Sequence, residues 1–466
     1  MSSQFNCVGS VSATEETRGA PVRNLNQFRQ ALKDEARNRA DQIACLRPQV
    51  FLAILFLIGF IVRLGALLSL RRISDLPGRQ EGADGIEFEQ LARALAEGRG
   101  YVRPTGIPTS FRAPGFPIFM SLIYRLTHLS VAAANLTFPI IGAAVCVVTY
   151  LLAREVISER AARFSAILAV FYFPSIYFST VWVSEPLFML SLALAMYLFL
   201  TYCRSHSPIV LAMAGLLLSW SVLVRPFAIL MLPALLLMDL LYSRRRMLTV
   251  PLLFACSLTP TLFWTARNVR VFHAFVFVAT NGGSTFYGGN NDKVLHDPQY
   301  YGAWVSTVHL PGRDEVMATP NEYAHDQVEW ALGKQWVRTH LFQMPLLIGM
   351  KLVRFVLPDV ESTNRLYAFL SIVTYLPFVP LWIVGTRASC RRQNRTTPWL
   401  LMHLSMLATA FTAIVFWGSP RFRDAAAPVA MVYAGYGLSI LLLSSAHQAP
   451  NYQPEMAEPI VHSLAY

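Results

Sequence analysis

Residues 48–68, "PQVFLAILFLIGFIVRLGALL", decide the fold, because they are long and apolar enough to cross a bilayer as one helix. A spanning helix needs on the order of 20 mostly apolar residues, since hydrocarbon offers backbone polar groups no partner. The whole chain of 466 residues is 54% hydrophobic and only 14% charged. This hydrophobic fraction is larger than the core of a water-soluble protein requires. The sequence therefore predicts an all-α polytopic membrane protein.

Apolar runs of similar length recur along the chain and bring the predicted bundle to about ten transmembrane helices. With an even number of spans, both ends of the chain lie on one side of the membrane. The loops on that side are rich in arginine, which is typical of the cytoplasmic face, so we expect both termini to be cytoplasmic. The further spans are 132–153, 162–180, 185–202, 208–224, 227–242, 248–265, 366–386, 398–417 and 425–444. The loop arginines are Arg154, Arg160, Arg163, Arg204, Arg244, Arg245, Arg246, Arg387, Arg391, Arg392 and Arg395.

The predicted organisation is one membrane domain, residues 48–444, between two tails. Residues 1–47 form a basic cytoplasmic tail and residues 445–466 a second cytoplasmic tail, while two larger loops, 69–131 and 266–365, lie outside. The formal net charge of +12 suits cytoplasmic loops and lipid headgroups. We therefore expect membrane lipids, and no nucleic acid, as partners.

The second external loop ends in residues 341–357, whose apolar positions recur at helical spacing. This stretch either crosses the membrane or lies along its surface. A crossing would move Arg391, Arg392 and Arg395 to the outside, against the charge rule. We prefer the surface location.

The first external loop contains an amphipathic segment, "DGIEFEQLARALAEG", that begins with Asp84. Its apolar residues follow the spacing of a helix that lies on an apolar support. Asp84 and Glu87, three residues apart, fit a capping box, in which Asp84 accepts backbone amide hydrogen bonds. The alternative is that Asp84 is catalytic. The apolar positions are Phe88, Leu91, Ala92 and Leu95.

Several arginines stand in the external loops or at the outer ends of spans, against the usual cytoplasmic bias. Each one alone is compatible with snorkelling to lipid headgroups. As a set on the same face as Asp84, they favour an anionic ligand, and paired guanidinium donors suit phosphate. The set is Arg112, Arg267, Arg270, Arg421 and Arg423.

The order and spacing of several segments resemble the GT-C superfamily of polyprenyl-phosphate-sugar-dependent glycosyltransferases. The similar bacterial members are the protein O-mannosyltransferases, the lipid A aminoarabinose transferase and the rhizobial lipopolysaccharide core galacturonosyltransferases, and the resemblance covers residues 50–444. The segments are "FEQLARALAEGRGY", "FRAPGFPIFMSLIYRL", "ISERAARFSAILAVFYFPSIYFSTVWVSEPLF", "SVLVRPFAILMLP", "TARNVRVFHAFVFVATNGGSTFYGGNN" and "SPRFRDAAAPV".

The resemblance implies a GT-C-like helical bundle in the plasma (inner) membrane, with its active site on the outer, periplasmic face. It implies a hexosyl or pentosyl transferase that takes a sugar from a polyprenyl-phosphate donor to a hydroxyl of a glycan, lipid or protein, with inversion. Asp84 matches the catalytic acid of the family, and Glu185, in "VSEPLF", matches its second acid, with Glu87 as a further candidate. The five external arginines would bind the donor phosphate.

Two residues depart from the family pattern. Gly85 stands where many relatives have a second acid, and Phe88 stands where tyrosine is usual. The missing acid leaves open whether a divalent metal is bound. Glu185 also has a structural interpretation, as an ordinary loop acid before Pro186, which is a favoured residue at a helix start.

A transporter or flippase for a lipid-linked or anionic solute is the alternative function. Transporters tend to place ionisable groups near the bilayer midplane. Here Asp239 is expected near the cytoplasmic end of its span, and Arg63 close enough to the outer end to snorkel. The polar residues gather at one face, which favours an enzyme over a transporter or a scaffold.

Overall fold

The structure is a computed structural model of the whole chain. It describes residue 35 and residues 46–70, 72–77, 83–243, 245–358, 365–391, 394 and 396–443. Most of the predicted N-terminal tail, the whole C-terminal tail, and Arg244, Arg392 and Arg395 lie outside the described residues. Among the described residues the secondary structure is helical, apart from an isolated bridge between Val102 and Pro108.

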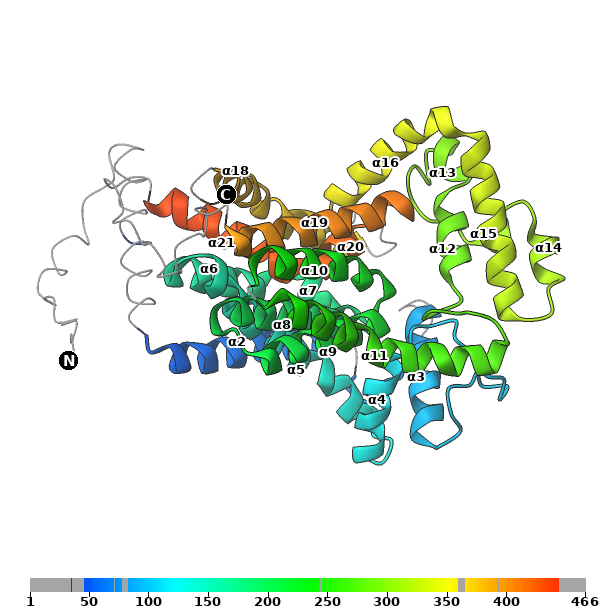
Figure 1. Cartoon of the computed structure of the whole chain (residues 1–466), viewed down its shortest axis with the longest axis horizontal. Helices are drawn as coiled ribbons and strands as arrows, with labels where there is room; N and C mark the ends of the chain where they lie inside the picture. Colours follow the sequence, from blue (N-terminus) through cyan, green and yellow to red (C-terminus); the bar gives the residue numbers. More distant parts are fainter. Residues whose placement is uncertain are drawn as a thin grey trace, which may run out of the picture.

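The core of the molecule is a bundle of apolar helices that run side by side along its longest axis (Figure 1). Each predicted span coincides with one helix or with a pair of consecutive helices. The bundle consists of α2 (Pro48–Leu70), α5 (Val131–Val156), α6 (Glu159–Phe171), α7 (Phe173–Phe178), α8 (Glu185–Ser205), α9 (Pro208–Val224), η2 (Pro226–Leu230), α10 (Met231–Tyr242), α11 (Arg246–Phe272), α17 (Arg365–Tyr375), α18 (Phe378–Ser389), α19 (Thr397–Val415), α20 (Pro420–Ala425) and α21 (Ala427–Leu443).

Five of the described helices, α2, α5, α8, α11 and α19, are long and apolar enough to cross a membrane, and the bent pair α17–α18 brings the number to six. The protein is therefore an integral membrane protein. The remaining predicted spans are shorter or interrupted, and the number of about ten crossings stays a prediction. Proline explains the interruptions, because Pro174, Pro226 and Pro377 stand where one helix ends and the next begins.

Loop arginines gather at the end of the bundle where α2 begins. Arg204, at the end of α8, contacts Glu155, near the end of α5. Arg163, near the start of α6, donates to the carbonyl of Leu46. These contacts bring three predicted cytoplasmic segments together, as the charge pattern requires.

The opposite end of the bundle carries the helices of both large loops (Figure 1). Those of the first loop are α3 (Ala83–Ala96) and α4 (Gly115–Leu126). Those of the second form a lobe of α12 (Gly282–Gly289), α13 (Asp292–His296), η3 (Thr307–His309), α14 (Arg313–Met317), α15 (Glu322–Thr339), η4 (Leu341–Gln343) and α16 (Met344–Val356).

Helix α16 covers most of the stretch 341–357, whose placement the sequence left open. It has 13 residues, which span about 20 Å at 1.5 Å per residue. The hydrocarbon core of a bilayer is about 30 Å thick, so α16 is too short to cross it. Its length favours the surface location, which stays a prediction.

The predicted support of α3 is present. Phe88, Leu91 and Ala92 are buried, and Leu95 is half-buried. Phe88 packs edge-to-face on Phe116 of α4, with ring centroids 5.0 Å apart. The apolar face of α3 therefore fixes the helix on α4 and on the outer end of the bundle.

The expectation that Arg63 snorkels to the outer surface is wrong. Arg63 is fully buried and donates to the carbonyls of Ala169 and Val170, at the end of α6, and to Ser175. Gly142 leaves the space for it, because a Cβ there would lie 2.5 Å from Arg63 Cδ. A helix break inside the bundle exposes carbonyls that need a donor, and Arg63 supplies it.

Candidate active site

Asp84 lies in the first turn of α3, at the end of the bundle that carries the two large loops (Figure 1). Its side chain is 32% exposed, and its Oδ1 forms an ion pair with Arg112 Nη2 at 2.8 Å. Its second oxygen lies 3.5 Å from Arg421 Nη1. The capping-box prediction places Asp84 before the helix, but α3 begins one residue earlier, at Ala83. Among the described contacts, Asp84 is held by two guanidinium groups.

The space around position 85 explains why glycine, and no second acid, follows Asp84. A Cβ at this position would lie 3.2 Å from the Cβ of Pro77 and 3.3 Å from Trp182. Such contacts are tighter than ordinary van der Waals packing, so a larger side chain would push α3 away from its support. The close approach of α3 to Trp182 therefore favours glycine here.

Arg112 binds two acids near the start of α3, Asp84 and Glu87. Besides Asp84, its Nε donates to Glu87 Oε2 at 2.5 Å. The guanidinium lies over the rings of Phe88 and Phe111, at 5.7 and 5.1 Å from their centroids. This aromatic support and the two ion pairs fix one orientation of the Asp84 carboxylate.

Glu185 lies at the start of α8 and is completely buried. Its Oε1 accepts from Arg421 Nε at 2.8 Å and lies 2.8 Å from Arg225 Nη1. Arg421 therefore joins the two carboxylates, because its other contact is Asp84. The predicted second acid thus lies in the same cluster as the predicted catalytic acid.

Arg225, at the end of α9, is a member of this cluster that the sequence analysis did not select. The segment "LVRPF" carries a usable signal, since an arginine there directly follows an apolar span on the external side. Arg225 Nη1 is buried against Glu185 Oε1, whereas the other oxygen, Glu185 Oε2, is buried without a hydrogen-bond partner among the described residues. Buried polar atoms without a partner are rare in proteins, and a catalytic role or a bound water or ion explains many of them.

The charges of the cluster keep Asp84 ionised. Burial raises its pKa, but Arg112 and Arg421 outweigh burial and hold the pKa below its usual value. Glu185 and Asp84 in turn raise the pKa of Arg421. Asp84 is therefore a carboxylate at neutral pH, and a weak base.

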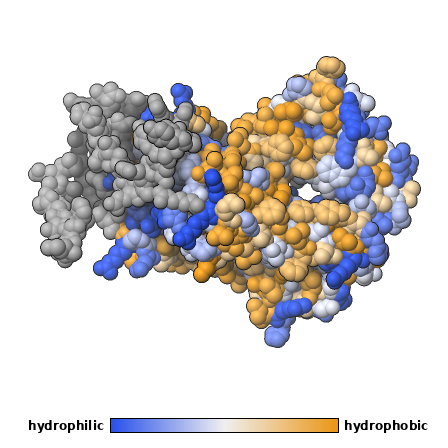
Figure 2. All heavy atoms as spheres, in the orientation of Figure 1, coloured by the Kyte–Doolittle hydropathy of each residue, from blue (hydrophilic) through white to orange (hydrophobic). Residues whose placement is uncertain are grey.

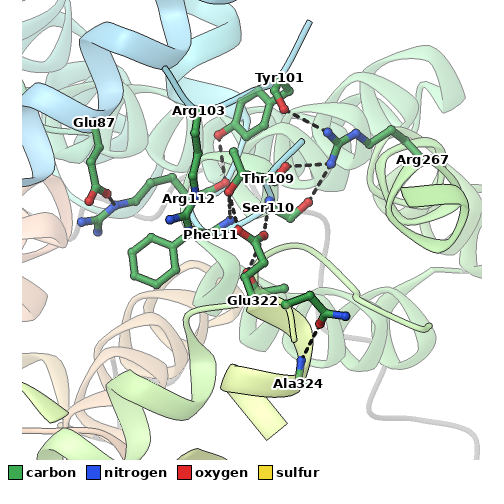
Figure 3. A network of polar contacts seen from close by, with 12 residues as sticks. Glu87, Tyr101, Arg103, Thr109, Ser110, Phe111, Arg112, Arg267, Glu322 and Ala324 are labelled. Carbon is green, nitrogen blue, oxygen red and sulfur yellow. Dashed lines mark hydrogen bonds and ion pairs between the residues drawn. The ribbon is translucent and has the colours of Figure 1, made fainter. Parts of the chain in front are cut away.

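Three of the predicted phosphate-binding arginines lie elsewhere. Arg267 donates to the carbonyls of Tyr101 and Thr109 and to Ser110 (Figure 3). Arg270 is exposed on the last turn of α11. Arg423 is buried, donates to the carbonyls that end α16, and pairs with Asp424. The structure thus brings Arg112 and Arg421 to Asp84.

Glu322, the first residue of α15, joins the lobe to the first loop (Figure 3). It accepts from Thr109 Oγ1 at 2.7 Å, from the Ser110 amide at 2.5 Å and from Arg103 at 3.0 Å. Arg267 and Glu322 thus hold opposite sides of the segment that leads to Arg112. We infer that they support the site without forming part of it.

The described side chains form no cluster of metal ligands. Among them, no group of three or more His, Cys, Asp or Glu residues is arranged to hold a metal ion. Both oxygens of Asp84 face guanidinium groups.

One family model matches part of the chain, and solved structures share its fold. Residues 111–267 match the family model described as dolichyl-phosphate-mannose-protein mannosyltransferase. No curated protein matches the sequence.

Among solved structures, the oligosaccharyltransferase of Archaeoglobus fulgidus, solved with zinc and sulfate, matches with a TM-score of 0.51 and 16% identity, over 84% of this chain and 49% of its own. The archaeal oligosaccharyltransferase AglB of the same organism, solved with an inhibitory peptide and a dolichol-phosphate, gives a TM-score of 0.49 and 15% identity, over 84% of this chain and 50% of its own. The chain thus spans about half the length of these proteins. Residues 111–267 are thus similar to this mannosyltransferase family, and the chain shares its fold with the oligosaccharyltransferase solved with zinc and sulfate.

Proposed function

We propose that this protein is a membrane glycosyltransferase that moves a sugar from a polyprenyl-phosphate donor to an acceptor hydroxyl on the outer, periplasmic face of the plasma membrane. The observation that carries the proposal is the ion-pair cluster of Asp84, Arg421 and Glu185 at one end of an apolar bundle. A carboxylate held by guanidinium groups beside a lipid phase suits a pair of substrates. The carboxylate can bind the hydroxyl of the acceptor, and the guanidinium groups can bind the phosphate of the donor.

The donor class is supported by the family match, whose description names a dolichyl-phosphate sugar. The site agrees with an anionic donor. The side chain of Arg421 is 41% exposed and lies at the open side of the cluster, while Glu185 behind it is buried. We assign the phosphate contact to Arg421, with Arg112 and Arg225 beside it.

In the proposed reaction, the acceptor oxygen attacks the anomeric carbon from the side opposite the phosphate, so that configuration inverts. The bond between the anomeric carbon and the phosphate oxygen breaks, and the polyprenyl phosphate keeps the electron pair. Arg421 stabilises the negative charge that develops on it. Asp84 orients the acceptor hydroxyl and receives its proton late, because the lowered pKa of Asp84 makes it a weak base.

The test uses the purified protein in liposomes with a panel of polyprenyl-phosphate sugars and measures release of polyprenyl phosphate. We expect release with one donor, and its loss in Asp84→Asn. The matched control is Glu97→Gln, because Glu97 is an acid of the same loop whose partner, Arg99, is exposed. Uptake of an anionic solute without release from any donor would support the transporter instead.

A further inference from the structure

Helix α16 has two different faces. The face formed by Leu347, Lys351 and Phe355 is buried against the rest of the protein. The opposite face is apolar and exposed, and it follows helical spacing. Its exposed residues are Leu346 (59%), Val353 (59%), Val356 (57%) and Leu357 (50%), and Phe342, one turn earlier in η4, is 102% exposed.

Helix α16 buries one of its two cations, while the other, Arg354, is half-buried beside the groove described below and donates to the carbonyl of Tyr301. Its charged Lys351 points inward, where Nζ donates to Asn290 at 2.9 Å and to the carbonyl of Ile414 at 3.1 Å. Residues 344–356 contain no acidic residue. A contiguous apolar surface of this kind marks an interaction with another apolar phase.

The exposed stripe continues the lipid-facing surface of the bundle. The contact between Lys351 and Ile414 places α16 beside the last turn of α19, and Phe411, one turn earlier on α19, is also exposed. In Figure 2 apolar residues predominate along the edge of the lobe that adjoins the bundle, and most polar residues of the lobe lie toward its far end.

A groove of about 540 Å³ follows the same stripe. Helix α16 forms one wall, and the turn at Pro298 and Tyr301 and the start of α20 at Pro420 form the others. Its lining is mostly hydrocarbon, which suits lipid chains better than a folded partner with a polar rim.

From these observations we propose that α16 lies in the outer leaflet with Phe342, Leu346 and Val353 among the lipid chains, so that the lobe is docked on the membrane surface. The occupant of the exposed stripe is the lipid bilayer itself. This inference does not depend on the glycosyltransferase activity.

Insertion of α16 into the outer leaflet would link the bilayer to the candidate active site, because α20 contacts both α16 and the acidic residues of the site. Arg423 donates to the carbonyls of Phe355, Val356 and Leu357 at the end of α16. Arg421, in the same short helix, contacts Asp84 and Glu185. A change in the depth of α16 would therefore act on the position of Arg421.

The test measures collision rates of a nitroxide label with oxygen, which concentrates in lipid, and with a polar nickel chelate, which stays in water. The label is attached at Phe342→Cys and Val353→Cys, in a chain whose six cysteines are replaced by alanine or serine. The protein is reconstituted in vesicles of phosphatidylethanolamine and phosphatidylglycerol. The control is Met317→Cys, since Met317 is 62% exposed in α14 of the same lobe.

We expect the ratio of oxygen to nickel collisions to be several-fold higher at positions 342 and 353 than at 317. Equal ratios at all three positions would show that α16 faces water and would overturn the proposal. Low collision rates with both reagents, together with spin–spin broadening, would show that a second copy of the chain covers the stripe, which would also overturn it.

Discussion

Arg421 Nη1 lies 3.5 Å from Asp84 Oδ2, although nearly the whole membrane domain separates the two residues in the sequence. The same guanidinium binds Glu185 through Nε at 2.8 Å. Arg421 is therefore the link between an acid of the first external loop and an acid at the start of α8. The bridging geometry depends on a planar group with several donors.

Arg421→Lys should lower the turnover number by about 10²–10³, because one ammonium group cannot hold both carboxylates and a developing phosphate charge. Release of polyprenyl phosphate at saturating donor measures the effect. Arg270→Lys is the control, since Arg270 is exposed on α11. Equal activity of the two variants would show that Arg421 takes no part in the reaction.

Glu185→Gln should lower stability as well as activity. The buried carboxylate balances Arg225 and Arg421, and removing one partner of a buried ion pair typically costs about 3–5 kcal/mol. Thermal unfolding in detergent should show a lower midpoint than the wild type. Glu97→Gln, at an exposed pair, should leave the midpoint unchanged.

Gly85→Asp should reduce activity by displacing α3, although it restores an acid next to Asp84. Its Cβ would lie 3.2 Å from Pro77 and 3.3 Å from Trp182, and overpacking of this kind costs about 1–3 kcal/mol. Unfolding midpoint and turnover should both fall.

The control for this substitution is Gly65→Ala in α2, where a Cβ meets no atom within 4 Å. Increased turnover in Gly85→Asp would mean that α3 tolerates the side chain and that the pattern with two adjacent acids also works in this protein.

The sequence predicted the positions of the apolar helices well, because each apolar run is bounded by charged or turn residues. It did not predict the interruptions of the spans. Residues 162–180 read as one continuous apolar run, yet they fold as α6 and the short α7. Arg63, whose own span gives no sign of the break, binds the carbonyls that the break exposes.

The residues of the candidate site were likewise predicted only in part, because the sequence does not show which contacts each arginine makes. Asp84, Glu185, Arg112 and Arg421 were selected and lie together. Arg267 and Arg423 are also arginines predicted on the same side of the membrane as Arg112 and Arg421. Their guanidinium groups, however, bind backbone carbonyls. The pattern of charges in a sequence shows neither which carbonyls a fold leaves unpaired nor that Arg225 pairs with Glu185.

The lobe should lose stability as the pH rises from 4.5 to about 7. Burial on α15 raises the pKa of Glu329 from its usual 4.5 to about 7. Below pH 4.5 this carboxyl is protonated in both the folded and the unfolded state. Between pH 4.5 and 7 the unfolded state ionises first, so the folded lobe is progressively destabilised, and the cost persists above pH 7.

Glu329→Gln, which is neutral at every pH, should remove this contribution. Asp326, whose pKa burial raises to about 6, is present in both proteins and acts in the same direction. Hydrogen–deuterium exchange of α12 and α15 should therefore be slower in the variant than in the wild type at pH 8, and alike in the two proteins at pH 4. An equal difference at both pH values would mean that the substitution acts through packing and that ionisation of Glu329 does not destabilise the lobe.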